Sequence, residues 1–538
     1  MKRALRFTSI FLLLMAAATA FASAYNARPK LIVIIVIDQF RGDYLERYHD
    51  RFGPGGFRMF TDQGAWFTDC YYGYANTRTE PDHATLFTGA YSNAHGVFNN
   101  EWWDEAKKRF VSSVDDDSYK LLGSNEAGPG ASPHSLMAST LGDELKLATQ
   151  GTSRVFAIAL KDRAAVLPGG FAANRAYWLD HQSGAWISST YYGNQLPEWV
   201  AQFNSGGRTD KYWNREWKDA TGKTLRITSK QDANGKAANF YDVVGPTPFA
   251  NDYELEFARE LITRDKLGSG ATTDLLAISL SANDILGHAV GPDSPQMAEM
   301  VLATDRQLAG FFQFLGKQIG LANVWLALSA DHGVAPTIPT DEKLRIPALV
   351  LSNDEIRQKM NAALAAKVGH QGEFVSRGDW PIVFLSQAAF ATTNTSEAEA
   401  ERAAGEALKQ LGARDAFTKT QLAAGDVRND ALGHRYLLSY SPLGGWWVMA
   451  VPPPYSLSRR VGTDHGLAYA YDTHVPLAFY GATFHAGVYH THCEPVDMAV
   501  TLASLLGINA PSSAVGRVLV EAVEPQSRPR AVTAGNSR

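Results

Sequence analysis

The sequence predicts an α/β fold in which a mostly parallel central sheet lies between helices and carries cap insertions. Short apolar runs recur along the 538 residues, and helical stretches separate them. The runs are continuous rather than alternating, which is typical of strands covered on both faces. The composition, 45% hydrophobic and 20% charged, excludes a disordered tail, a coiled coil and a disulfide-stapled miniprotein.

The first expected strand is the β-branched run Leu31–Ile37, which ends at Asp38. Similar runs follow at 155–160, 275–280, 324–329, 348–351, 382–385 and 475–480. Helices are expected between them at 139–149, 254–264, 295–317, 396–411 and 496–506. This alternation of strands and helices predicts a large α/β sandwich.

Two long polar stretches, near 171–247 and 419–460, interrupt this pattern. Connections of that length are usually functional covers or insertions. No internal repeat or low-complexity linker divides the chain. We therefore expect one catalytic domain over residues 25–520, with 521–538 as a flexible C-terminal tail.

The first 24 residues have the pattern of a signal peptide. Lys2, Arg3 and Arg6 precede an apolar stretch at 10–21, and Ala22-Ser23-Ala24 forms a small-residue cleavage site. The apolar stretch is shorter than the ~20 residues that a membrane span needs. We expect a periplasmic or secreted product with no stable membrane insertion after cleavage.

The net charge of −5, with no basic run, gives no reason to expect a nucleic-acid partner. The chain has two cysteines, Cys70 and Cys493, and export would permit a disulfide. Pairing depends on the fold, and two buried free thiols are the alternative. Neither cysteine lies in a CxxC pattern, so any metal must be held by histidines and carboxylates. The sequence predicts no oligomeric state.

Acids and histidines directly after the apolar runs are the candidate site residues, because open parallel sheets bind ligands beyond the carboxyl ends of their strands. They are Asp38 after the first run, Asp284 and His288 after the third, Asp331 and His332 after the fourth, and His465 in a late loop. One such Asp is more often a helix cap and one such His a structural residue. Acids and histidines at four places at one end of a sheet together predict a zinc-type metal centre.

Three other histidines are not expected to be ligands. His474 precedes the run 475–480, which puts it at the amino end of that strand and away from the site. His83 and His95 fall within or after the helix expected beyond residue 79.

Thr79 is the candidate nucleophile. Pro81 two residues later suits the first turn of a helix, whose free backbone N–H groups favour an anion. The alternative is that Thr79 only caps the helix. A metal could instead hold its hydroxyl as an alkoxide.

These residues together resemble the alkaline phosphatase superfamily, which includes nucleotide pyrophosphatase/phosphodiesterases, sulfatases and cofactor-independent phosphoglycerate mutases. The matching motifs are Asp38, Thr79-x-Pro-x-His-Ala, Asp284-x-x-x-His288, Asp331-His332-Gly333 and His465-Gly466. Within the superfamily the chain looks similar to periplasmic, threonine-nucleophile alkaline phosphatases of the PafA type. Lys161-Asp162-Arg163 matches their Lys-x-Arg pair, and Asn100 matches their asparagine about twenty residues after the nucleophile.

The resemblance implies two Zn²⁺ ions per chain. Asp284, His288 and His465 would hold one ion, while Asp38, Asp331 and His332 would hold the other together with Thr79. Thr79 would then form a phosphothreonine intermediate, and Asn100, Lys161 and Arg163 would bind the substrate oxygens.

The Lys161 and Arg163 pair favours small-molecule phosphate monoesters as substrates. A monoester carries nearly two negative charges on three oxygens, whereas a diester carries one, so it needs additional cationic donors. An exposed basic turn is the structural alternative for this pair. The alternative functions are a phosphodiesterase or nucleotide pyrophosphatase on the same scaffold, or a phosphoester-binding protein without turnover.

The chain departs from the family at Asp82, where a small glycine is usual, and Glu80 adds a second acid beside the nucleophile. Both could bring negative charge close to the phosphate site. Asp82 is expected to point to solvent or to cap the helix.

Overall fold

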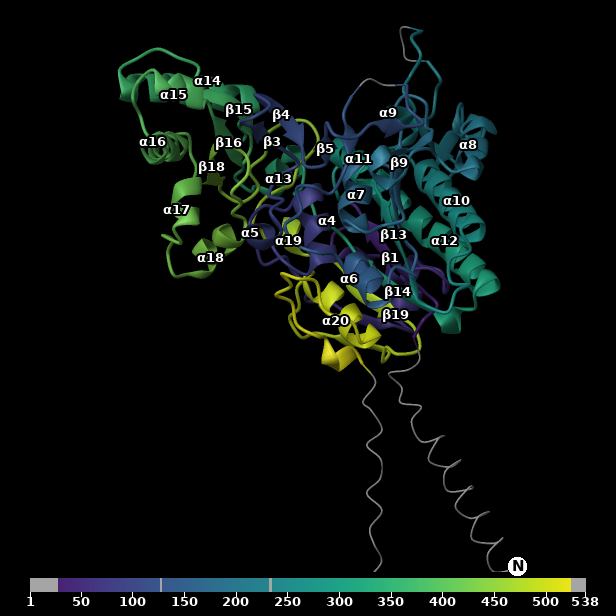
Figure 1. Cartoon of the computed structure of the whole chain (residues 1–538). Coiled ribbons are helices and arrows are strands. Elements are labelled where there is room, and N and C mark those ends of the chain that lie inside the picture. Colours follow the sequence, from purple (N-terminus) through teal and green to yellow (C-terminus); the bar gives the residue numbers. More distant parts are fainter. Residues whose placement is uncertain (1–27, 126–127, 232–234, 524–538) are drawn as a thin grey trace, which may run out of the picture.

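The computed structural model describes residues 28–125, 128–231 and 235–523 (Figure 1). The expected signal segment 1–24 and positions 524–538 of the expected tail lie outside the described residues. The described start of that tail includes Val523, which pairs with Phe484 in an isolated antiparallel bridge.

A ten-stranded sheet forms the centre of the molecule, in the order β20-β2-β19-β14-β1-β13-β8-β9-β10-β6. Its five central strands are all parallel: β14 (Val324–Ser329), β1 (Leu31–Ile37), β13 (Asp274–Leu280), β8 (Val155–Ala159) and β9 (Arg175–Leu179). The outer strands are β20 (Gly487–Tyr489), β2 (Ala65–Phe67), β19 (Leu477–Tyr480), β10 (Trp186–Ser189) and β6 (Leu121–Leu122). The prediction of a mostly parallel central sheet is confirmed.

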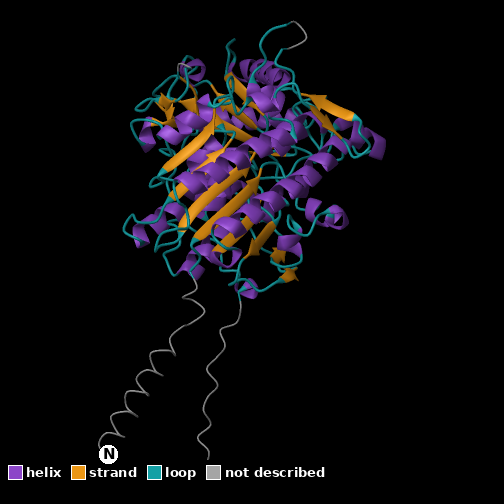
Figure 2. Ribbon diagram, turned by 90° about the vertical axis from the view of Figure 1, so that its right-hand side faces the viewer, coloured by secondary structure: helices purple, strands orange, loops and turns teal. Residues whose placement is uncertain are grey.

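Helices cover both faces of this sheet, which explains its uninterrupted apolar strands. All seven residues of β1 are buried. Helices α10 (Pro248–Arg264) and α12 (Pro295–Gln318) lie on one face. On the other face lie α4 (Thr79–Thr88), α6 (Leu141–Ala148), α7 (Arg163–Gly169) and α20 (Asp497–Leu506). Figure 2 shows the strands side by side beneath their helices.

The five expected helices are present, with ends shifted by local chemistry. Helix α10 begins six residues before the expected start, because Pro248 occupies its first turn, where a missing N–H costs nothing. A reciprocal capping box of Thr140 and Asp143 starts α6, and one of Ser396 and Glu399 starts α16 (Glu397–Gln410).

A second, four-stranded antiparallel sheet lies apart from the first, at the upper left of Figure 1. We call it the appended sheet: β15 (Val375–Asp379), β16 (Ile382–Leu385), β18 (Trp446–Val451) and β17 (Asp415–Thr418), in that order. Helices α14 (Asn353–Val368), α16, α17 (Lys419–Ala423) and α18 (Ala431–Leu438) accompany it. Most of the stretch 419–460 therefore belongs to this unit.

The expectation that the run 382–385 belongs to the parallel sheet is wrong. Ile382 and Phe384 pack into one apolar cluster, while Val383 and Leu385 pack into another. An antiparallel strand covered on both faces has the same continuous apolar pattern as a parallel one.

The run 348–351 does not form a strand. Only Val350 pairs there, through an isolated parallel bridge to Leu457. Pro347 lacks the N–H that a neighbouring strand would need, and Val350 is only half-buried.

The run 475–480 forms β19, which is antiparallel to β14, with Ser329 opposite Leu477. The amino end of β19 therefore lies at the carboxyl edge of the parallel strands, so the reason for discounting His474 was wrong. Its ring instead hydrogen-bonds the Thr68 carbonyl at 3.0 Å and stacks on Tyr71.

Shorter elements complete the described fold. The short helices are α2 (Tyr44–Arg47), α3 (Arg58–Thr61), α5 (Ser92–His95), α8 (Glu198–Ser205), α9 (Phe240–Val244), α11 (Ala282–Val290), α13 (Ile338–Leu344), α15 (Gln387–Ala391) and α19 (Ala470–Thr473). The paired strands are β3 (Glu101–Asp104) with β4 (Arg109–Ser112), β5 (Asp115–Asp116) with β7 (Gly130–Ala131), and β11 (Glu216–Lys218) with β12 (Thr224–Ile227). Among the described residues, no helix combines the length and apolarity needed to span a bilayer.

Candidate metal centre

The six candidate ligands come together at the carboxyl edge of the central sheet. Asp38 directly follows β1, Asp331 and His332 follow β14, and Asp284 and His288 lie on α11 just after β13. His465 joins them from the loop before α19. The strand-end placement expected from the sequence is therefore present.

One group consists of Asp38, Asp331 and His332, all fully buried. His332 Nε2 lies 3.6 Å from Asp38 Oδ1 and 3.5 Å from Asp331 Oδ2. None of these three atoms has a hydrogen-bond partner among the described residues. Buried polar atoms normally have partners, so a converging set without them fits a bound cation.

A second group adjoins the first. Asp284 Oδ1 lies 3.1 Å from His288 Nε2 and 4.0 Å from His465 Nε2. Asp464 also approaches His288 and His465 closely enough to share an ion with them. The sequence reasoning missed Asp464 as a ligand candidate, although it stands beside His465 in the same motif. The rings of His465 and His332 stack with their centroids 3.5 Å apart, which joins the two groups.

Backbone carbonyls orient the three imidazoles. The Nδ1 atoms of His288, His332 and His465 lie 2.8–3.0 Å from the carbonyls of Thr463, Gly333 and Thr77. A carbonyl requires a proton on Nδ1, which leaves Nε2 as the basic nitrogen facing the carboxylates. These contacts preset the tautomer that a metal ligand needs.

Gln39 connects the carboxylates of the two groups. Its backbone N–H donates to Asp331 Oδ1 at 2.9 Å, and its side-chain amide donates to Asp284 Oδ1 at 2.6 Å. Gln39 has a φ of 61°, an unusual left-handed conformation for this residue type. Asn283 donates to the carbonyls of Asp38 and Gln39 and holds this turn in place. In the sequence, only its place directly after Asp38 could have marked Gln39 as a residue of this site.

Lys161 bridges the two groups. Its Nζ lies 2.6 Å from both Asp38 Oδ2 and Asp284 Oδ2. Burial disfavours the charged ammonium, but the two carboxylates outweigh burial and raise the pKa of Lys161. Burial likewise opposes ionisation of Asp284, yet Lys161 and His288 hold the pKa of that carboxyl well below its usual range. Lys161 is therefore buried as a cation, and the alternative of an exposed basic turn does not hold for it.

Thr79 is the first residue of α4 and is buried. The N-cap is Arg78, which has extended backbone, so Thr79 is not the cap that the alternative proposed. The Thr79 carbonyl lies 2.7 Å from His83 Nδ1, and that nitrogen is 3.5 Å from Asp331 Oδ2. The start of α4 therefore lies beside the first group of ligands.

His83 and His95 both make hydrogen bonds with residues of the fold. His83 Nε2 contacts Ser279 Oγ at 2.7 Å, and burial lowers its pKa to about 4, so the ring stays neutral. His95 Nε2 contacts Thr85 Oγ1, and its Nδ1 accepts from the Val97 N–H.

Glu80 links the residues expected on the phosphate side of the site. It is buried, its carboxylate lies 3.0 Å from Arg163 Nε, and its backbone N–H donates to Asn100 Oδ1 at 3.2 Å. Burial raises the pKa of Glu80 to about 8, with Arg163 opposing the shift. From the sequence, Glu80 was expected only to add negative charge near the phosphate site. No local pattern indicated its contact with Arg163.

Asp82 neither points to solvent nor caps α4. It is fully buried in the first turn of the helix and accepts a hydrogen bond from the Tyr74 hydroxyl. Burial raises the pKa of its carboxyl well above the usual range, so Asp82 adds little negative charge.

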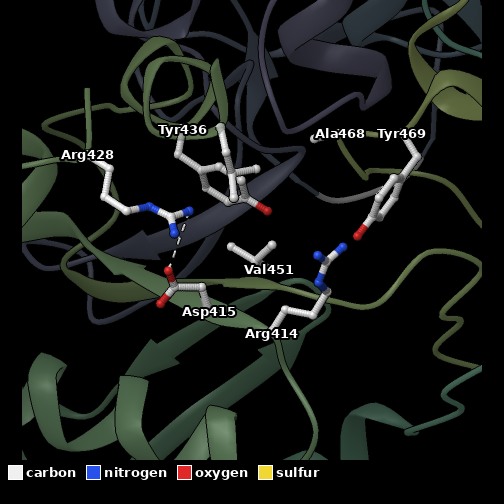
Figure 3. Close-up of a pocket in the computed structure, with 8 residues that line it drawn as sticks. Arg414, Asp415, Arg428, Tyr436, Val451, Ala468 and Tyr469 are labelled. Carbon is white, nitrogen blue, oxygen red and sulfur yellow. Dashed lines mark ion pairs between the residues drawn. The ribbon is translucent and has the colours of Figure 1, made fainter. Parts of the chain in front are cut away.

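Two cavities lie in these parts of the molecule, one on the metal-centre side and one by the appended sheet. One of about 430 Å³ lies beside the start of α4 and includes Arg78, Asn100, Arg163 and Asp379 in its lining. A smaller one, of about 170 Å³, lies by the appended sheet (Figure 3). There Arg428 points toward Asp415 and Arg414 toward Tyr469. None of the residues lining the smaller cavity belongs to the groups of candidate ligands.

Comparison with known proteins identifies the class of protein. The type I phosphodiesterase / nucleotide pyrophosphatase family matches residues 32–425, so the chain belongs to this family and to the alkaline phosphatase superfamily. Within the superfamily it is PafA-like. It is 33% identical to alkaline phosphatase PhoV of Synechococcus elongatus, covering 92% of this chain and 93% of that protein.

Alkaline phosphatase PafA of Elizabethkingia meningoseptica is 30% identical, over 92% of this chain and 95% of PafA. The crystal structure of wild-type PafA superposes with a TM-score of 0.83 at 29% identity, covering 92% of this chain and 99% of PafA. The alkaline phosphatase-like fold is therefore confirmed.

Proposed function

We propose that this protein is a zinc-dependent alkaline phosphatase that hydrolyses small phosphate monoesters through a phosphothreonine intermediate. Relatives named alkaline phosphatases along nearly the whole chain support a phosphatase. The observation that carries the proposal is the pair of ligand groups at the start of α4, joined by Lys161 and next to a buried threonine that is not a cap. A protein that only bound phosphoesters would not need that arrangement.

The ligand assignment follows the two groups. Asp284, His288 and His465 hold one zinc ion, and Asp38, Asp331 and His332 hold the other together with Thr79. Mixed imidazole and carboxylate donors are the usual zinc ligands in catalytic sites. The ions supply Lewis acidity, which lowers the pKa of the threonine hydroxyl and stabilises the departing oxygen.

The chemistry proceeds in two displacements at phosphorus. The Thr79 oxygen forms a bond to phosphorus as the bond to the leaving alkoxide breaks. Water then attacks the phosphothreonine, which releases phosphate and restores the Thr79 hydroxyl. Asn100, Lys161, Arg163 and the free N–H groups at the start of α4 bind the non-bridging oxygens, where charge is displayed during transfer.

Glu80 positions Arg163 for this task. A guanidinium held by a buried carboxylate loses less rotamer freedom when it binds phosphate. The same contact has a cost, because a paired guanidinium presents less net charge to a dianion.

A phosphodiesterase is the second candidate, and one observation favours it. Lys161 already contacts two carboxylates and Arg163 already contacts Glu80, so part of their positive charge is neutralised within the protein. A diester, with its single negative charge, needs less cationic compensation. The family that matches the chain includes phosphodiesterases by description.

We also propose that the chain is exported and that residues 25–520 act as one catalytic domain. The signal-peptide pattern of residues 1–24 supports export to the periplasm or beyond. The appended sheet supports a single unit, because Arg78 beside the nucleophile pairs with Asp379 of β15 at 3.1 Å.

One experiment separates the two candidate activities. The metal content of purified protein is measured together with hydrolysis of an aryl phosphomonoester and of its matched methyl diester. Zinc near two equivalents and a strong preference for the monoester support the proposal. A preference for the diester would replace it with the phosphodiesterase, and metal-free binding without turnover would reject both.

A further inference from the structure

The two cysteines of the chain meet in the fold although they lie near opposite ends of the sequence. Cys70 and Cys493 stand directly opposite each other in an isolated parallel bridge. The Tyr71 N–H donates to the Cys493 carbonyl at 3.1 Å, and the Cys493 N–H donates to the Asp69 carbonyl at 3.1 Å. These two bonds fix the register of the pair.

The side chains also meet. The Cys493 side chain acts on the Cys70 thiol, and in the structure both residues are buried and both thiols are free. Neighbouring positions on paired strands bring Cα atoms to about 5 Å, which is within the range that a disulfide spans. Little backbone movement is needed to join the sulfurs.

We propose that Cys70 and Cys493 form a disulfide bond in the exported protein. The proposal depends on the proposed export, because such bonds persist in oxidising compartments. It does not depend on the proposed phosphatase activity.

The oxidant is a disulfide, either of a thiol oxidoreductase or of glutathione. One cysteine thiolate attacks it, forming a mixed disulfide and expelling one thiolate. The second cysteine thiolate then attacks the mixed disulfide, which forms the Cys70–Cys493 bond and expels the other thiolate. The protein loses two electrons and two protons, and the donor disulfide becomes two thiols.

Burial, followed by the contact with Cys493, raises the pKa of the Cys70 thiol. Cys70 is therefore rarely a thiolate in the folded protein, and its attack on an external disulfide is slow. Oxidation accordingly belongs to the folding stage, before the pair is enclosed.

The bond would tie two segments that define the active-site side of the molecule. Cys70 begins the segment that leads to Thr79, and Tyr72 in that segment donates to the Ala330 carbonyl, next to Asp331. Cys493 begins the segment that leads to α20, which packs against α4. A link between them closes a loop of most of the chain, and such links chiefly destabilise the unfolded state.

The test traps thiols in the full chain, purified after export, by denaturing it in an alkylating reagent with and without prior reduction. We expect no alkylation without reduction, two alkylated cysteines after it, and a peptide containing Cys70 linked to one containing Cys493. A second sample, purified reduced from the cytoplasm, is unfolded and refolded with a glutathione redox buffer, and we expect the same linked peptide.

Two free thiols in both samples would overturn the proposal. A linked peptide in the refolded sample, from a protein that the host retains in its cytoplasm, would support the disulfide and contradict the proposed export. Activity on the aryl phosphomonoester reports separately on the proposed function.

Thermal unfolding provides the matched control. Reduction should lower the Tm of the oxidised chain by roughly 3–8 °C. The Tm of Cys70→Ser/Cys493→Ser and of Cys70→Ala/Cys493→Ala should not respond to reductant. Two variants are needed because a buried serine hydroxyl has its own cost. A wild-type Tm that ignores reductant despite confirmed reduction contradicts the stabilising role.

Discussion

Acids are buried both at the metal-centre edge of the central sheet and in the appended sheet, and at the edge a buried lysine contacts two of them. At the edge, Lys161 lies between Asp38 and Asp284 and keeps Asp284 ionised. In the appended sheet, Glu401 of α16 is buried and accepts two hydrogen bonds from Thr420. Burial raises the pKa of Glu401 to about 7.

The two regions show how a candidate metal site can be distinguished from a structural core that contains a buried acid. Burying an acid costs free energy unless a cation compensates it, and an uncompensated acid becomes neutral instead. Asp38, Asp331 and His332 leave ligand atoms without hydrogen-bond partners among the described residues, beside the ion pair of Lys161 and Asp284. In the appended sheet, Glu401 belongs to no converging group of ligand-type side chains among the described residues, which indicates a structural role.

The largest expected loss of turnover comes from removing the proposed nucleophile. Thr79→Ala should lower monoester turnover on the order of 10⁴-fold or more, because no other hydroxyl takes its place. Metal content should remain close to wild type, since six other side chains are proposed as ligands. Thr79→Ser, which keeps a hydroxyl, is the matched control. An alanine variant that retains turnover would show that water attacks the ester directly.

Metal removal is the next largest effect. Dialysis against a chelator should lower monoester turnover by at least ~10³-fold, because several kcal/mol of charge stabilisation are lost. The Tm should fall as well, since a ligand bound only by the folded state stabilises it. Readdition of zinc should restore both quantities. Full activity in chelated protein would contradict the assignment of the ligand groups.

Variants of Arg163 and Glu80 test whether the site discriminates between phosphate monoesters and diesters. Arg163→Ala should lower kcat/KM for the monoester by roughly 10²–10³-fold and change diester turnover little. Above pH 8, where the Glu80 carboxyl is ionised, Glu80→Gln should cost about 10-fold, because Arg163 remains but loses its ionic partner. Equal losses on both ester types would point to a general structural role.

The smallest effect concerns stability in the appended sheet. Folded Glu401 keeps its proton up to a pH of about 7, whereas the unfolded chain releases it near the ordinary glutamate pKa of 4.5. The folded state therefore binds more protons in this window, and the stability it confers is fully present below pH 4.5. It is lost as pH rises to 7 and is constant above that.

The loss amounts to up to about 3 kcal/mol in the free energy of unfolding. Glu401→Gln should remove this pH dependence, which is measured as the difference between the wild-type and variant free energies of unfolding at pH 4 and pH 8. Glu397→Gln, at a partly exposed acid of the same helix, is the control. A wild-type minus variant difference that does not change with pH would show that Glu401 is ionised in the fold.

The sequence predicted the central sheet and the six ligand candidates because strand ends carry their own signal. A buried run such as Leu31–Ile37 followed by Asp38 marks both the element and the edge where ligands gather. The run 382–385 was misassigned because burial on both faces erases the difference between sheet types. The apolar pattern does not show strand direction either. The argument that placed His474 at the far edge of the sheet was therefore wrong.

The residues that support the site were the hardest to find. Gln39 bridges two carboxylates only because a left-handed turn aims its backbone and side chain at different partners. Glu80 acts through Arg163, which lies far away in the sequence. Such roles depend on tertiary contacts, and a single sequence has no local pattern for them.

Lys161 has a consequence for the order in which this molecule is assembled. A chain that brings its own positive charge to Asp38 and Asp284 does not leave these two carboxylates to repel each other until an ion arrives. The polypeptide can therefore bring these two carboxylates together with a charge of its own between them.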